Sequence, residues 1–149
     1  MNNTKIYWLI FSDADYFGKS FLKKGFRHVA VLTHDDYNWI KFNPKNNQMF
    51  FKILPNEISD NVPYIMLKND SSLNILKVEV EISNRLFPSL NYFSMMNCVG
   101  IAKYFLGIWR FIFTPYSLYR YLTNIMGGYD YSNQIVHVTN VGGCHGRIK

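Results

Sequence analysis

Cysteine is scarce in this chain, and its scarcity excludes two classes of small protein. The 149 residues include only two cysteines, Cys98 and Cys144. Two cysteines cannot make a disulfide framework, and they cannot make a four-cysteine zinc site. We therefore expect the protein to work in a reducing compartment such as the cytoplasm.

Long apolar runs are also missing. The most hydrophobic segment runs from Val99 to Phe113, and it is interrupted by Lys103, Gly107 and Arg110. A membrane-spanning helix needs about 18 to 20 apolar residues without such breaks. The opening stretch MNNTKIYWLIFSD has a short apolar run but no small-residue cleavage site of the kind that ends a secretory signal. We expect a soluble protein with no membrane span.

Acidic residues are fewer than basic ones, and the formal net charge is +6. A nucleic-acid-binding module would need those charges gathered on one surface. The densest group, Lys19, Lys23, Lys24 and Arg27, is short enough to be a solvated face. The aromatic residues follow strand and helix periodicity, which is typical of a core. We expect no specific nucleic-acid partner, and a basic binding module remains a weaker alternative.

Metal and phosphate motifs are absent too. No glycine-rich phosphate loop follows any expected strand. The acidic pairs Asp13 with Asp15 and Asp35 with Asp36 have the spacing of turn formers. Cys144 and His145 are adjacent in a glycine-rich tail, and two ligands do not make a metal site. The sequence implies no cofactor.

Alternating apolar residues dominate the first half of the chain, and helical spacing follows, so the expected class is α+β with an antiparallel sheet packed against helices. We expect a domain over residues 1–126 and a Gly- and polar-rich tail over 127–149. The expected strands are Lys5–Phe11, Phe26–Thr33, Asn38–Asn43 (ended by Pro44), Met49–Leu54, Val62–Lys68, Asn74–Ile82 and, in the tail, Gln134–Thr139. The expected helices are Asp15–Lys23, Cys98–Leu106 and Thr114–Asn124.

The clearest motif is a hairpin whose first strand lies in GFRHVAVL, Gly25 to Leu32. If HDDY is a four-residue loop, Thr33 lies opposite Asn38, and His28 lies opposite Asn43. An amide oxygen accepts a hydrogen bond from one imidazole nitrogen and leaves the other free to act as a base. His28 is therefore a candidate general base with Asn43 to orient it. The alternative is a structural histidine.

Cys98 is the candidate nucleophile, because it begins an expected apolar helix. Backbone N–H groups and the helix dipole at that position favour a thiolate. Its own backbone N–H, and Ser12 from the first loop, are candidates for stabilising an oxyanion. The alternative is that Cys98 is a small buried apolar residue.

The order of these motifs carries a resemblance. A His strand in GFRHVAVL followed by Asn97-Cys98 in NCVGIAKYFLGI is similar to the circularly permuted branch of the NlpC/P60 superfamily, which has a papain-like fold and includes the lecithin:retinol acyltransferase-like proteins. Together with TPYSLYRYL, Thr114 to Leu122, the pattern also resembles small uncharacterised phage and proteobacterial proteins. The lecithin:retinol acyltransferase-like members of the superfamily carry a second histidine on the strand after the first, whereas this chain has Asn43 on that strand.

The resemblance implies a thiol hydrolase or acyl-transfer enzyme, of the cysteine peptidase or amidase kind, acting through Cys98, His28 and Asn43. Its substrate would hold a peptide or amide bond, or an ester or thioester. The alternative is a non-catalytic phage-encoded structural or interaction protein on the same fold, with other virion proteins as partners. The phage likeness would place the protein in the host cytoplasm or in the virion.

Overall fold

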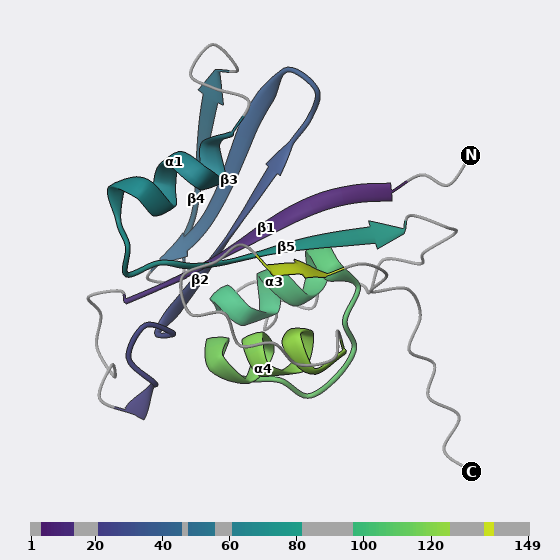
Figure 1. The fold of residues 1–149 in the computed structure, drawn as a ribbon. Helices are drawn as coiled ribbons and strands as arrows, with labels where there is room; N and C mark the ends of the chain where they lie inside the picture. Colours follow the sequence, from purple (N-terminus) through teal and green to yellow (C-terminus); the bar gives the residue numbers. More distant parts are fainter. Residues whose placement is uncertain are drawn as a thin grey trace.

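The computed structural model describes residues 4–13, 21–45, 48–55, 61–81, 97–125 and 136–138. The structure is one mixed layer of strands with helices on both sides (Figure 1). Its elements are, in chain order, β1 (Thr4–Ser12), β2 (His28–His34), β3 (Asn38–Lys45), β4 (Gln48–Pro55), α1 (Val62–Asn69), β5 (Asn74–Glu81), α3 (Cys98–Leu106), α4 (Pro115–Ile125) and β6 (Val136–Val138).

The strands form one sheet in the order β4-β3-β2-β1-β5-β6. The first five pair antiparallel, and β6 joins β5 in parallel. The expected α+β class with an antiparallel sheet is therefore confirmed. β1 lies at the centre, where Leu9 pairs with Val31 on one side and with Leu76 on the other.

Strand alternation sorts the central side chains onto two faces. Leu9, Val31 and Val78 share the face that α3 and α4 cover. Ile10 and Leu32 share the opposite face, where α1 supplies Val62 and packs with Met66 and Leu67. Because both faces are buried, the central strands read as nearly continuous apolar runs rather than as half-polar ones.

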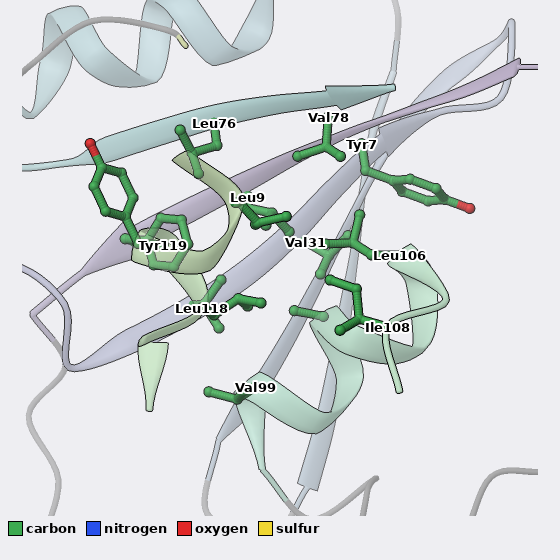
Figure 2. Close-up of a cluster of buried hydrophobic side chains, with 14 of the residues drawn as sticks. Tyr7, Leu9, Val31, Leu76, Val78, Val99, Leu106, Ile108, Leu118 and Tyr119 are labelled. Atoms are coloured by element: carbon green, nitrogen blue, oxygen red, sulfur yellow. The ribbon is translucent and has the colours of Figure 1, made fainter. Parts of the chain in front are cut away.

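The larger core lies between the sheet and the pair α3 and α4. Figure 2 shows strand residues such as Leu9 and Val78 pointing towards Leu106 and Leu118 of the helices. Aromatic rings close one end, where Phe11 meets Tyr119 edge-on with ring centroids 5.4 Å apart. Each fully buried large apolar side chain contributes about 1.5–3 kcal/mol relative to exposure, so this cluster, which holds more buried residues than the one under α1, contributes more to folding.

The segment Val62–Lys68 is a helix, so the expected strand there is wrong. The apolar residues that face the core follow helical spacing rather than alternation, since Val62 and Met66 are four residues apart and pack in the same cluster. Pro63 lies in the first turn, where a missing N–H costs nothing. The proline is the signal that favours a helix start over a strand.

The β2–β3 register differs by two residues from the expected one. Val31 pairs with Phe42 and Thr33 with Ile40, because backbone pairing extends beyond His34 and Trp39 to the Asp35 N–H, which donates to the Asn38 carbonyl at 3.1 Å. The loop therefore has two residues rather than four, and Asp36 takes a left-handed conformation with φ 74°. Two-residue hairpin loops require positive φ at their first position, which aspartate tolerates. A shift of two leaves every side chain on its expected face.

The remaining expectations are mostly confirmed. α3 ends at Gly107 in the left-handed conformation (φ 65°), and Thr114 Oγ1 caps α4 by accepting from the Ser117 N–H at 3.1 Å. β6 lies within the expected tail strand. β3 does not end at Pro44, however, because Pro44 pairs with Met49 and the strand continues to Lys45. The helix expected at Asp15–Lys23 lies mainly outside the described residues, as does most of the tail over 127–149.

Candidate functional site

The candidate site lies where β2 and β3 stop pairing. Their last paired residues are Val31 and Phe42. In an antiparallel hairpin the hydrogen-bonded pairs alternate, and the Asp35–Asn38 bond fixes which pairs those are. The Val29 N–H consequently points towards β3, where its next partner would be Pro44. We call this position, between Val29 and Pro44, the ladder end.

His28 and Asn43 meet across the ladder end. The His28 Nε2 atom lies 2.7 Å from the Asn43 Oδ1 atom. The amide oxygen only accepts, so Nε2 carries the proton and donates it, which leaves the Nδ1 lone pair as the basic site. The predicted register places these residues directly opposite each other. In the observed register His28 would lie opposite Lys45, so the contact with Asn43 is diagonal and is made by the side chains.

The environment of His28 keeps its ring neutral. Burial lowers the pKa of His28 below its ordinary value of 6.5, the Asn43 hydrogen bond opposes that change, and the charges of Lys41 and Lys45 lower the pKa further. A buried imidazole beside two cations has little tendency to bind a proton at neutral pH. His28 is therefore available as a base rather than as a cation.

Cys98 is the first residue of α3, as the sequence predicts. Asn97 precedes it in extended conformation, and its Oδ1 accepts a hydrogen bond from the Gly100 N–H at 2.6 Å. Asn97 is thus the N-cap of the helix, a role that the sequence reasoning missed because it considered the Asn-Cys pair only as a motif. The signal was there: asparagine before an apolar helical pattern is a preferred cap.

The Cys98 thiol is also neutral. Burial raises its pKa above the ordinary value of 9.0, and this outweighs hydrogen bonds to the sulfur from the N–H groups of Val29, Val99 and Cys98 itself, which lower the pKa. The contact with Val29 brings the sulfur to the ladder end, beside the residue that follows His28. The helix terminus alone does not make a thiolate here.

The sulfur and the imidazole reach the ladder end from different directions. Val29 faces α3, so strand alternation assigns His28 to the other face, with Ala30. No hydrogen bond joins the Cys98 Sγ atom to the His28 ring in the part of the chain that the structure describes. The structure thus joins His28 to Asn43 on one face of the sheet, whereas Cys98 packs on the other face and contacts the backbone of Val29, the residue that follows His28.

Two other expected participants have clear positions. Ser12 pairs with His28 across β1 and β2, so its side chain shares the His28 face rather than the face of α3. His34 lies at the end of β2, where its ring packs on Trp39 with centroids 4.9 Å apart and its Nδ1 atom accepts from the Asp36 N–H. His34 therefore serves the hairpin.

Asp35 behaves as the expected turn former, whereas Asp13 accepts a hydrogen bond from the Gly25 N–H at 2.7 Å and pairs with Arg27 at 3.7 Å. The Asp35 carboxylate accepts from the N–H groups of Tyr37 and Asn38 at 3.1 and 2.6 Å, and these bonds lower its pKa. Among the described residues, no group of three or more His, Cys, Asp or Glu side chains is placed to hold a metal ion. Asp15, Cys144 and His145 lie outside those residues.

A row of lysines beside His28 was also missed. Lys41 and Lys45 flank Asn43 on β3, and Lys52 pairs directly with Lys41 from β4. Burial lowers the pKa of Lys41, and the charge of Lys52 lowers it further. The alternation Lys-x-Asn-x-Lys was visible in the sequence, but the pairing with Lys52 required the β3–β4 register.

Comparison with known proteins gave no match: no family model, no curated protein and no solved structure is similar to this chain. Within the described segments, no helix has both the length and the apolar character needed to cross a bilayer.

Proposed function

We propose that the protein is a cysteine-dependent hydrolase or acyl-transfer enzyme, with Cys98 as nucleophile, His28 as general base and Asn43 as the residue that orients the imidazole. The observation that carries this proposal is the 2.7 Å hydrogen bond from His28 Nε2 to Asn43 Oδ1. It fixes the tautomer in which Nδ1 is basic, and the Cys98 sulfur contacts the backbone of Val29, the next residue along β2.

The chemistry follows from two neutral groups. The Cys98 sulfur attacks a substrate carbonyl carbon while His28 Nδ1 takes the thiol proton, and the carbonyl oxygen becomes an oxyanion. Backbone N–H groups at the start of α3 are the available donors for that oxyanion. The C–N bond of an amide then breaks, and the imidazolium gives its proton to the leaving amine. Water or an amine resolves the resulting thioester.

Because the thiol pKa is raised and the imidazole pKa is lowered, the pair is not a preformed thiolate–imidazolium ion pair. Proton transfer must accompany attack, which requires the His28 ring, assigned to the α1 face, and the Cys98 sulfur, on the α3 face, to come together at the ladder end. The β2–β3 ladder stops short of this position, and Pro44 has no N–H to donate to the Val29 carbonyl there.

The arrangement is in keeping with the resemblance to permuted NlpC/P60 proteins, in which a His strand precedes an Asn-Cys helix. On that likeness the substrate is a peptide or amide, or an ester or thioester, and a phage protein would act in the host cytoplasm or in the virion. Asn43 takes the place of the second histidine of the acyltransferase-like members.

The test is thiol alkylation of a Cys144→Ser protein, which leaves Cys98 as its single cysteine. We expect the rate with iodoacetamide between pH 5 and 9 to fall at least tenfold at neutral pH in His28→Ala, and less in Asn43→Ala. His34→Ala, a histidine on the same strand, is the matched control and should leave the rate unchanged. Identical profiles for the parent protein and His28→Ala would remove the chemical basis of the proposal.

A non-catalytic interaction protein on the same fold is the second candidate. The specific observation in its favour is that no hydrogen bond joins the sulfur to the imidazole among the described residues. On this alternative Cys98 is a core residue of α3 that packs against the sheet face covered by α3 and α4. It predicts that Cys98→Ser and His28→Gln each leave partner binding intact.

A further inference from the structure

β4 is an outer strand of the sheet, and half of its backbone groups face away from β3. Since Ile40 and Phe42 direct their backbone groups to β2, Lys41 and Asn43 direct theirs to β4, where they meet Lys52 and Phe50. The alternate β4 residues, Met49, Phe51 and Ile53, therefore present N–H and C=O groups along the outer edge.

The β4 side chains leave this edge open on both faces. Phe51 and Ile53, on the face of α3, have 63% and 64% of their surface exposed, and Phe50 on the other face has 49%. Edge strands that must stay free are usually short or bulged, or they carry proline or charged side chains, especially lysine. β4 has eight residues and pairs regularly with β3 along its whole length; its proline is the last residue, and Lys52 is its only charged residue. A partner strand must therefore answer the charge of Lys52.

Lysines on the α1 face of β3 and β4 give the edge a preference for an acidic partner strand. Lys52 lies directly opposite Lys41, and like charges in that position repel. Lys45 follows two residues after Asn43 on the same face. Neither Lys41 nor Lys52 makes an ion pair with a described acidic residue: the described ion pairs join Lys77 to Glu79 and Arg27 to Asp13. A carboxylate on a strand next to Lys52 would offset this repulsion.

We propose that the β4 edge binds an extended segment of a partner protein in which apolar and acidic residues alternate. Its backbone pairs with Met49, Phe51 and Ile53. Its apolar side chains cover Phe51 and Ile53 on one face, while its carboxylates meet Lys52 on the other. This is recognition by strand addition, with the backbone giving affinity and alternate side chains giving specificity. It does not depend on the proposed catalysis.

The probe is the blocked peptide acetyl-Thr-Val-Glu-Val-Glu-Val-Glu-Val-Thr-amide, with glutamine in place of glutamate as its neutral counterpart. Calorimetric titration should show the acidic peptide binding about two- to fivefold more tightly, which is the gain from one exposed ion pair with Lys52. Amide hydrogen exchange should slow at Phe51 and Ile53 when it binds. Equal affinities for the two peptides, or no binding, would overturn the proposal.

Matched variants separate the edge from the fold. Ile53→Pro removes an outward N–H that the sheet does not use, so the protein should fold and lose the peptide, whereas Ile53→Thr keeps that N–H and should retain binding. Lys52→Glu should reverse the preference towards the neutral peptide. Lys24→Glu makes the same charge change at an exposed site away from β4 and should not alter the preference.

Self-association is the competing occupant. The net charge of +6 opposes pairing of two copies through the same lysine-bearing edge. Sedimentation should therefore show a monomer at concentrations at which the peptide binds. A dimer that Ile53→Pro abolishes, with no peptide binding, would show that a second copy occupies the edge and would overturn the proposal.

Discussion

The centre of the sheet and its β3–β4 end, which we call the wing, are built from similar apolar residues but differ in how deeply those residues are buried. In the centre, Leu9 and Phe11 of β1 have 0% of their surface exposed, because helices cover both faces. In the wing, Phe51 and Ile53 are more than half exposed. Buried apolar area supplies the folding free energy, so the centre specifies the fold and the wing is left to present side chains.

His28 and Asn43 lie at the boundary between these regions. His28 begins the central strand β2, and Asn43 belongs to the wing strand β3. The backbone ladder between the strands has already ended at Val31 and Phe42, so a side-chain hydrogen bond continues the connection. The candidate site therefore lies where a rigid region supports a less covered one, a common place for function.

The largest expected effect is on the free energy of unfolding, when the same residue type, phenylalanine, is replaced in the centre and in the wing. Phe11→Ala, in the centre, should lower the free energy of unfolding by about 3–5 kcal/mol, since it leaves a cavity among packed rings. Phe51→Ala, in the wing, should lower it by less than about 1 kcal/mol, because most of its ring is already in water. Urea denaturation measures both, and equal losses would contradict the division into centre and wing.

Loss of the boundary hydrogen bond should come next. Asn43→Ala leaves the His28 Nε2 donor without its partner and should cost about 1–3 kcal/mol in urea denaturation. The pKa of His28 should fall further, because the Asn43 bond is what raises it. NMR titration of the ring measures that change. Asn69→Ala, at an exposed position at the end of α1, is the control and should change neither quantity.

The N-cap of α3 should have a moderate effect. Asn97→Ala removes the bond to the Gly100 N–H and should cost about 1 kcal/mol. Asn97→Asp keeps an accepting oxygen at the helix N-terminus and should retain the stability. Thermal unfolding measures the difference. If both variants unfold alike, Asn97 does not stabilise the helix through its side chain.

The smallest effect is the pH dependence that His28 contributes. Its folded pKa is lowered, so the folded state binds fewer protons than the unfolded state below the ordinary pKa of 6.5. The stability from neutral His28 is complete above pH 6.5 and is lost as the pH falls towards the folded pKa. Urea midpoints at pH 7.5 and 5.5 should differ more for the natural protein than for His28→Gln. An unchanged difference would show that the ring titrates normally.

The sequence allowed the strands and the two helices α3 and α4 to be predicted, because alternation, caps and a glycine stop are local signals. The face of each hairpin residue was also predictable, since an error of two residues preserves parity. The register itself depended on Asp36 taking a positive φ, which aspartate allows but does not require. The alternation within Val62–Lys68 wrongly predicts a strand, and the local signal for the observed helix α1 is Pro63 in its first turn.

The candidate site was less accessible from sequence. His28, Asn43 and Cys98 could be named from their residue types and order, and the His28–Asn43 contact followed from parity. The burial that keeps both the thiol and the ring neutral depends on packing between α3 and the sheet, which no local pattern encodes. The Lys41–Lys52 pair likewise needed the alignment of two strands.

Pro44 has a consequence for the backbone at the ladder end. The next hydrogen-bonded pair after Val31 and Phe42 would join Val29 to residue 44, and proline has no N–H to donate to the Val29 carbonyl. One of the two hydrogen bonds of that pair is therefore lost whatever the side chains do, and in the observed arrangement the Val29 N–H serves the Cys98 sulfur instead of a neighbouring strand.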